Sequence, residues 1–128
     1  MNGKRYLLDT NAIVQLLAGN KELAGIVRGA DFLATSVVCQ FEFLSYPGLT
    51  EPDARLYAEF SSRIHTFPVP ADDASFSDAV VAFRKTKKLK MPDAIIAATA
   101  KVNGCALVSA DDDFKKAEGL PRLTYTPS

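Results

Sequence analysis

Short apolar runs alternate along the chain with longer segments in which apolar residues recur every three or four positions. Short runs of this kind are typical of buried strands, whereas a spacing of three and four is typical of helices with one apolar face. Strands are predicted at Tyr6–Leu8, Phe32–Thr35, His65–Val69, Ala106–Val108 and Leu123–Tyr125. The pattern therefore predicts a chain in which strands and helices alternate.

Helices are predicted between these strands. One follows Asp9, and the others span Leu23–Val27, Ser36–Leu44, Glu51–Ile64, Ala71–Thr86 and Pro92–Ala100. The last of these is apolar on nearly every face, so we expect it to be buried. This order of elements predicts an α/β fold with a mostly parallel central sheet of four to five strands and helices on both faces. Since the chain has no internal repeat or linker, we expect residues 1–128 to form a single domain.

The composition is that of an ordinary globular protein. Among 128 residues, 15 are basic and 15 are acidic, so the formal net charge is zero; 48% are hydrophobic. This balance excludes a strongly basic nucleic-acid coat and a disordered acidic tail. Cys39 and Cys105 both lie in apolar runs, which favours reduced thiols, and no apolar run approaches the roughly 18 residues of a membrane span. We therefore expect a cytoplasmic protein that does not contact a membrane.

Three acidic segments are predicted to converge. Asp9 ends the first strand, Asp111 to Asp113 follow the strand that closes at Val108, and Asp93 opens the helix that leads back to that strand. In a parallel sheet these positions all lie at the carboxyl ends of the strands, where ligands bind. Glu42 lies about six residues into its helix, roughly 9 Å along the axis. It joins the group only if that helix leans across the site.

Each of these acidic residues also has an ordinary explanation. Asp9 could cap a helix, Asp93 could complement a helix dipole, Asp111 to Asp113 could form a solvated turn, and Glu42 could face outward. Taken together, however, several adjacent carboxylates repel one another unless a cation neutralises them. Oxygen ligands without histidine or cysteine favour Mg²⁺ or Mn²⁺ over zinc.

Four segments resemble the PIN domain family: Leu7-Leu8-Asp9-Thr10-Asn11, Ser36 with Glu42, Met91 to Ala100, and Leu107 to Phe114. The chain length and the segment Pro92-Asp93-Ala94-Ile95-Ile96-Ala97-Ala98 are similar to those of the VapC-type toxins within that family. The resemblance extends from about residue 6 to residue 114 and implies a PIN-like three-layer sandwich.

The resemblance also implies an activity, which is metal-dependent cleavage of single-stranded RNA that leaves a 5′-phosphate and a 3′-hydroxyl. It further implies a toxin of a toxin–antitoxin pair, a homodimer, a small antitoxin as partner and Mg²⁺ or Mn²⁺ as cofactor. The catalytic residues it implies are Asp9, Glu42, Asp93 and Asp111. The metal ligands are Asp9, Asp93, Asp111 and Asp113, and the supporting polar residues are Asn11 and Ser109.

A basic run precedes Asp93 directly. Five of the 15 basic residues fall within seven positions: Arg84, Lys85, Lys87, Lys88 and Lys90. Such a run is either a solvated helix end or a surface that holds RNA phosphates. Candidates for stacking on unpaired bases are Tyr46, Tyr57 and Phe114, although packing in the core is the favoured role for Phe114.

Two alternatives use the same residues. One is a receiver-like Mg²⁺-binding signalling module, which would need paired acids after the first strand and a phosphate-accepting aspartate at the end of a mid-chain strand. The other is a catalytically inactive PIN-like domain that only binds a partner. The acidic positions are all present, which favours the nuclease over the inactive domain.

Overall fold

The computed structural model describes residues 3–128. Its strands are β1 (Arg5–Leu8), β2 (Phe32–Ser36), β3 (His65–Phe67), β4 (Ala106–Val108) and β5 (Arg122–Leu123). Its α-helices are α1 (Thr10–Leu17), α2 (Lys21–Arg28), α3 (Val37–Leu44), α4 (Glu51–Ser61), α5 (Ala74–Lys85) and α6 (Met91–Val102), and a short 3₁₀ helix, η1, spans Asp112–Lys116.

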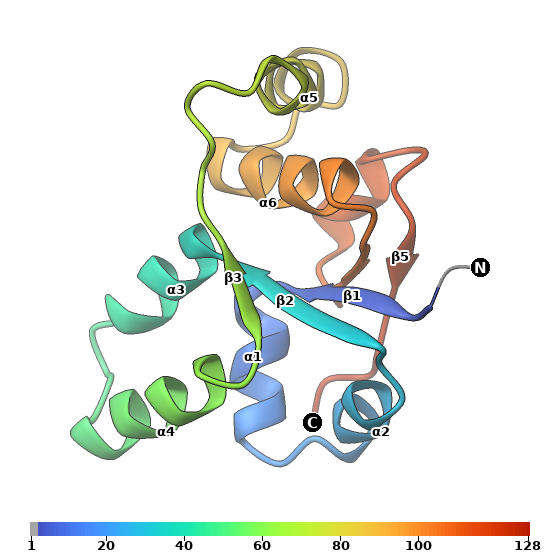
Figure 1. The fold of residues 1–128 in the computed structure, drawn as a ribbon. Helices are drawn as coiled ribbons and strands as arrows, with labels where there is room; N and C mark the ends of the chain where they lie inside the picture. The colour runs from blue at the N-terminus through green and yellow to red at the C-terminus, as the bar shows by residue number, and fades with distance from the viewer. Residues whose placement is uncertain (1–2) are drawn as a thin grey trace.

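The five strands form one parallel sheet in the order β3-β2-β1-β4-β5. β1 lies at the centre, where Leu7 is in register with Ala34 on one side and with Leu107 on the other. The chain builds outward from β1 to β3 and then crosses back to place β4 on the other side of β1 (Figure 1). This reversal of strand order lies between β1 and β4, which is where parallel sheets bind ligands.

Helices cover both faces of the sheet, which confirms the predicted α/β three-layer fold. In Figure 1, α5 and α6 lie above the sheet, whereas α1, α2 and α4 lie below it. As the apolar sequence of α6 predicts, its inner residues are buried, including Ala94, Ile96, Ala97, Ala98 and Ala100. The longest helices, α5 and α6, have 12 residues each, and within residues 3–128 no helix has the length and apolarity needed to cross a membrane.

Capping side chains fix where several helices begin. The Asp9 carboxylate accepts a hydrogen bond from the Ala12 backbone N–H at 2.8 Å, and Ser36 caps α3, as its sequence position indicates. α5 begins at Ala74, three residues later than predicted, because Asp73 is its N-cap.

Other predicted boundaries were wrong as well. β3 ends at Phe67 instead of Val69, since Pro68 has no N–H to continue the ladder. The helix expected to reach Ile64 ends at Ser61. The last strand is Arg122–Leu123 instead of Leu123–Tyr125, and only these two residues pair with β4.

Candidate metal centre

The acidic site lies at the carboxyl ends of β1 and β4. Asp9 directly follows β1, and Ser109 and Asp111 follow β4. The N-terminus of α6 brings Asp93 to the same edge, in the first turn of that helix. The site is therefore built from three segments that are remote in sequence and that the parallel sheet brings together.

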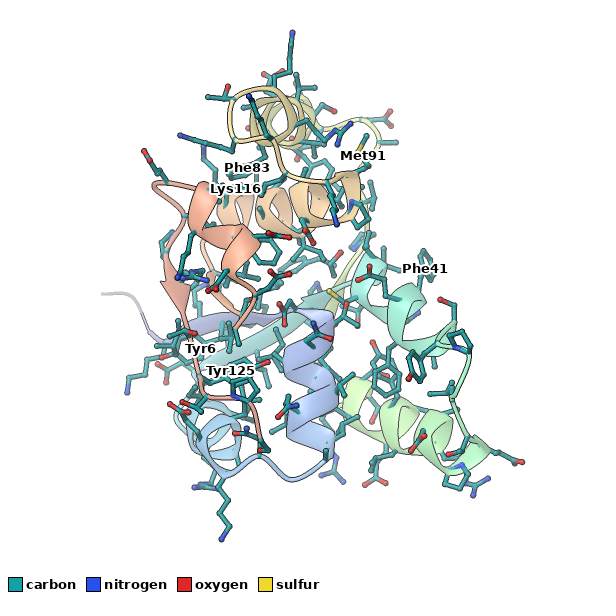
Figure 2. The ribbon with its side chains drawn as sticks, turned by 180° about the vertical axis from the view of Figure 1, so that it is seen from behind. Tyr6, Phe41, Phe83, Met91, Lys116 and Tyr125 are labelled. Carbon is teal, nitrogen blue, oxygen red and sulfur yellow. The ribbon has the colours of Figure 1, made fainter. Side chains whose placement is uncertain are left out.

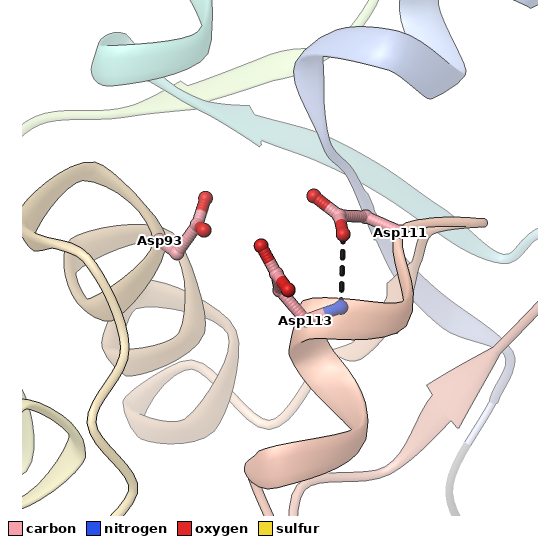
Figure 3. A group of neighbouring side chains, drawn as sticks. All are labelled: Asp93, Asp111 and Asp113. Atoms are coloured by element: carbon pink, nitrogen blue, oxygen red, sulfur yellow. Dashed lines mark hydrogen bonds between the residues drawn. The ribbon is translucent and has the colours of Figure 1, made fainter.

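Asp93, Asp111 and Asp113 form the centre of the site. Each offers a carboxylate oxygen, and these three oxygens all lie within 4.8 Å of one another. Figure 3 shows the three side chains pointing into a common space from α6, the loop after β4 and η1. The Asp113 backbone N–H donates to Asp111 Oδ1 at 2.9 Å, which fixes the orientation of Asp111. We call these three residues the acidic cluster.

Asp9 lies behind the cluster and is buried, with 4% of its surface exposed. Burial raises the pKa of its carboxyl from 3.8 to about 6, against the opposing effect of hydrogen bonds from the Ser109 hydroxyl and the Ala12 N–H. The negative charges of Asp111 and Asp93 raise the pKa of Asp9 further, because like charges nearby disfavour its ionised form.

The pKa of Asp93 is also raised. Its partial burial is the largest cause, followed by the charges of Asp111, Asp113 and Glu42, while Lys90 acts in the opposite direction. Like-charged carboxylates that face one another in this way are stabilised by a cation between them. An all-oxygen donor set suits a hard divalent ion, so the residues present fit a metal of the Mg²⁺ type.

Glu42 reaches this edge of the sheet from α3. Its Oε1 accepts a hydrogen bond from the hydroxyl of Thr10, the first residue of α1, at 2.5 Å. The charge of Glu42 also raises the pKa of Asp93, so Glu42 lies near the acidic cluster without being one of its three residues. The Thr10 contact thus brings Glu42 of α3 to the start of α1 at this edge of the sheet, although Glu42 lies well inside its own helix.

The two predicted supporting residues differ in their placement. Ser109 is fully buried, and its Oγ accepts a hydrogen bond from the Asp111 N–H at 3.0 Å. Asn11 is exposed and lines a neighbouring groove instead of the acidic cluster.

Sequence reasoning missed two residues that hold the site. Thr10 contacts Glu42, and Arg122 donates from Nη1 to the Asp111 backbone oxygen at 3.2 Å. The position of Thr10 directly after Asp9 was a usable signal, because a hydroxyl there lies beside the site. The position of Arg122 carried no such signal.

An apolar groove runs from Thr10 and Glu42 between α1, α3 and α4. Its volume is about 410 Å³. Besides these two residues it is lined by Asn11, Val14, Leu17, Ala18, Phe43, Tyr46, Leu49, Asp53 and Leu56. Tyr46 is exposed at its rim, whereas Tyr57 is buried, so the expectation that Tyr57 could stack on bases was wrong. Phe114 is buried in the core, which is the role favoured for it.

The members of the basic run have different surroundings. Arg84 is a structural residue, because its Nη1 donates to the Leu89 backbone oxygen at 3.0 Å. Lys87 lies 3.8 Å from a carboxylate oxygen of Glu118. Lys90 is the N-cap residue of α6 and is close enough to Asp93 to lower its pKa, while Lys85 and Lys88 are exposed.

Apolar side chains are exposed near the same edge. Phe41 on α3 and Met91 at the start of α6 are both largely exposed and lie on the same side of the molecule (Figure 2).

Comparison with known proteins gives one family and many similar folds. The profile of the PIN domain family matches residues 6–120. A toxin–antitoxin complex from Klebsiella pneumoniae is similar at 25% identity with a TM-score of 0.74, covering 96% of this chain and 98% of that chain. Among curated proteins, none matches the sequence significantly.

Two further solved structures share the fold at lower identity. VapBC-1 from nontypeable Haemophilus influenzae has a TM-score of 0.79 at 20% identity, covering 93% of this chain and 96% of that one. VapBC2 from Rickettsia felis, bound to a DNA fragment from its promoter, has a TM-score of 0.75 at 19% identity, with coverages of 94% and 98%. The strand order and the helices on both faces are thus those of a known fold.

Proposed function

The chain belongs to the PIN domain family, and from this premise we propose that it is a metal-dependent endoribonuclease. Its substrate is single-stranded RNA in the cytoplasm, its cofactor is Mg²⁺ or Mn²⁺, and its products carry a 5′-phosphate and a 3′-hydroxyl. It acts as the toxin of a toxin–antitoxin pair, and residues 1–128 are one PIN-like domain.

One observation carries the proposal, namely the three carboxylates of the acidic cluster, whose oxygens lie within 4.8 Å of one another. Asp9 lies at the same sheet edge, where the charges of Asp111 and Asp93 raise its pKa, and the charge of Glu42 raises the pKa of Asp93. So many like charges at one sheet edge are costly in a structural role but serve to hold a divalent cation.

Each acidic residue has a role in this proposal. Asp93, Asp111 and Asp113 hold the cation, and the buried Asp9 adds charge behind them. A divalent cation at this position supplies Lewis-acid activation of the phosphate and of the attacking water. Glu42, whose Oε1 accepts the Thr10 hydroxyl, is the general base that accepts a proton from the water.

The RNA backbone would lie along the exposed lysines next to the cluster. Three exposed lysines can bind phosphates there, namely Lys85, Lys88 and Lys90. Lys87 and Arg84 contribute less, because each already has a partner within the protein. Tyr46, exposed at the rim of the groove, is the aromatic residue best placed to stack on a base.

The test is cleavage of a single-stranded RNA by the purified protein. We expect cleavage with Mg²⁺ or Mn²⁺, none with EDTA, and a loss of at least about 100-fold for Asp93→Asn. Asp112→Asn is the matched control, because Asp112 is exposed and lies outside the acidic cluster. Cleavage that survives both EDTA and Asp93→Asn would overturn the proposal.

The toxin role implies protein partners. Solved structures similar to this chain are toxin–antitoxin complexes, and we propose that a small antitoxin inserts an apolar helix into the groove between α1, α3 and α4. Co-expression of the product of a small overlapping reading frame tests the antitoxin and should abolish cleavage.

We further propose a homodimer, which would cover exposed residues such as Phe41 and Met91. Sedimentation tests the homodimer and should give twice the mass of one chain.

The two alternatives fare differently. A receiver-like module needs an aspartate at the end of a mid-chain strand, whereas β2 and β3 end at Ser36 and Phe67. The inactive binding domain differs from our proposal only in chemistry. The cleavage assay decides between them, because an inactive domain would show no metal-dependent product.

A further inference from the structure

Glu42 is held at the site by one side chain. Thr10 Oγ1 donates to Glu42 Oε1 at 2.5 Å, and within residues 3–128 no other side chain donates a hydrogen bond or forms an ion pair with this carboxylate. Glu42 itself is exposed. Its long side chain has several rotamers that would carry the carboxylate into water, away from the negative charges of the acidic cluster.

Thr10 is fixed much more firmly than Glu42. It is the first residue of α1 and directly follows the buried Asp9, whose side chain caps the same helix. Thr10 is half-buried, unlike the exposed Glu42. A threonine hydroxyl has one hydrogen to donate and two lone pairs to accept with. The single hydrogen of the Thr10 hydroxyl goes to Glu42.

We propose that Thr10 is a positioning residue whose hydroxyl holds the Glu42 carboxylate over the acidic cluster. The inference rests on the proposed function, because positioning Glu42 matters for cleavage only if the site is a nuclease. The favourable contact offsets the repulsion between Glu42 and Asp93, since a hydrogen bond to a charged acceptor is stronger than one between neutral groups. Thr10 acts through Glu42 and does not need to contact RNA or metal.

The test is a double-mutant cycle with Thr10→Val and Glu42→Gln. Valine keeps the branched shape of threonine and removes only the hydroxyl, whereas Thr10→Ser keeps the hydroxyl and removes a methyl group. We expect Thr10→Val to lower kcat about tenfold with little change in KM, and Thr10→Ser to stay within about twofold of the native chain. In the Glu42→Gln background, Thr10→Val should have little further effect, because the residue it acts through has already lost its charge.

A second cycle needs neither metal nor RNA. The same four proteins are unfolded with urea in EDTA, and the coupling between the two positions is expected to be about threefold in the unfolding equilibrium constant. Coupling in this cycle supports the contact independently of activity. A general disturbance of α1 would not produce such coupling between Thr10 and Glu42.

The possible outcomes separate the inference from the proposed function. Additive effects in both cycles, or a Thr10→Ser protein as impaired as Thr10→Val, would overturn the role of Thr10. A native chain that cuts no RNA would overturn the proposed function instead. In that case the urea cycle alone decides whether Thr10 holds Glu42.

Discussion

The hydroxyl of Ser109 lies beside the buried carboxylate of Asp9, whose pKa it lowers, where the neighbouring strands β1 and β4 end. The same hydroxyl oxygen accepts the Asp111 N–H at 3.0 Å. One buried serine therefore links the most deeply buried acid of the site to the loop that carries the acidic cluster. The position of Asp111 thus depends on packing beneath it as well as on its own loop.

Burial of Asp9 predicts an unusual pH dependence for the metal-free protein. Because its pKa is about 6 when folded and 3.8 ordinarily, the folded state binds more protons than the unfolded state between these values. The free energy of unfolding should therefore fall as pH rises from about 4 to about 6, by up to about 3 kcal/mol. Asp9→Asn should lack this step and be more stable than the native chain at pH 8.

Urea unfolding in EDTA across pH 4 to 8 checks this prediction. Asp78→Asn is a suitable control, because Asp78 is exposed on α5 and lies away from the acidic cluster. Parallel pH profiles for Asp9→Asn and the native chain would show that Asp9 is not the group responsible.

Metal binding should stabilise the folded chain through the acidic cluster. At a Mn²⁺ concentration about 100 times the dissociation constant, the expected gain in unfolding free energy is about 2.7 kcal/mol. Asp93→Asn, Asp111→Asn and Asp113→Asn should each lose most of this gain, since each removes one of the grouped carboxylates. Asp112→Asn should keep it, and thermal unfolding with and without Mn²⁺ measures the difference. An equal loss in Asp112→Asn would mean that the ion binds elsewhere.

The convergence of Asp93, Asp111 and Asp113 could be predicted from sequence, because the order of strands and helices in a parallel sheet determines which ends meet. The position of Glu42 could not be predicted in the same way. It depends on the tilt of α3, which packing against other elements sets and which local spacing does not encode. The Thr10 contact is hidden for the same reason, since it joins two helices.

Boundaries were least predictable where elements are short. β5 has two residues and η1 has five, too few to show a periodic apolar pattern. Buried runs such as Leu7-Leu8 and Leu107-Val108 were located correctly, since their burial on both faces makes the apolar signal continuous. The short elements are set by pairing with a neighbour or by a capping side chain such as Asp111.

The phenol of Tyr57 predicts a stabilising substitution. Tyr57 is 2% exposed and packs on Phe43 with ring centroids 4.7 Å apart, and within residues 3–128 its hydroxyl has no hydrogen-bond partner. A buried polar group without a partner is costly, so Tyr57→Phe should raise the unfolding free energy by about 1 kcal/mol. Tyr46→Phe, at an exposed position, should leave it unchanged. A less stable Tyr57→Phe protein in urea unfolding would indicate that the hydroxyl is bonded in solution.

The lysines next to the acidic cluster should determine how RNA binding depends on salt. Lys88 and Lys90 are exposed, and Lys90 is the N-cap residue of the helix that presents Asp93. Each lysine that neutralises a phosphate of a single strand contributes about 0.7 to the slope of log affinity against log salt concentration. Replacing both with glutamine should therefore reduce the slope by about 1.4. Lys88 has a positive φ of 58°, which glycine adopts more readily than other residues. Replacing Lys88 with glycine would therefore change the flexibility of the backbone as well as the charge, so glutamine is used instead.

The binding measurement is made in the Asp93→Asn background, where RNA is not expected to be cut. Lys101→Gln is the matched control, because Lys101 lies in the last turn of α6, at the opposite end of the helix from Lys90. Arg84→Gln should lower the free energy of unfolding, because Arg84 Nη1 donates to the Leu89 backbone oxygen at 3.0 Å. Its effect on the salt slope should be small. If Lys101→Gln lowers the slope as much per lysine as the paired substitution, phosphates are held by charge spread over the surface, and the basic run has no special role.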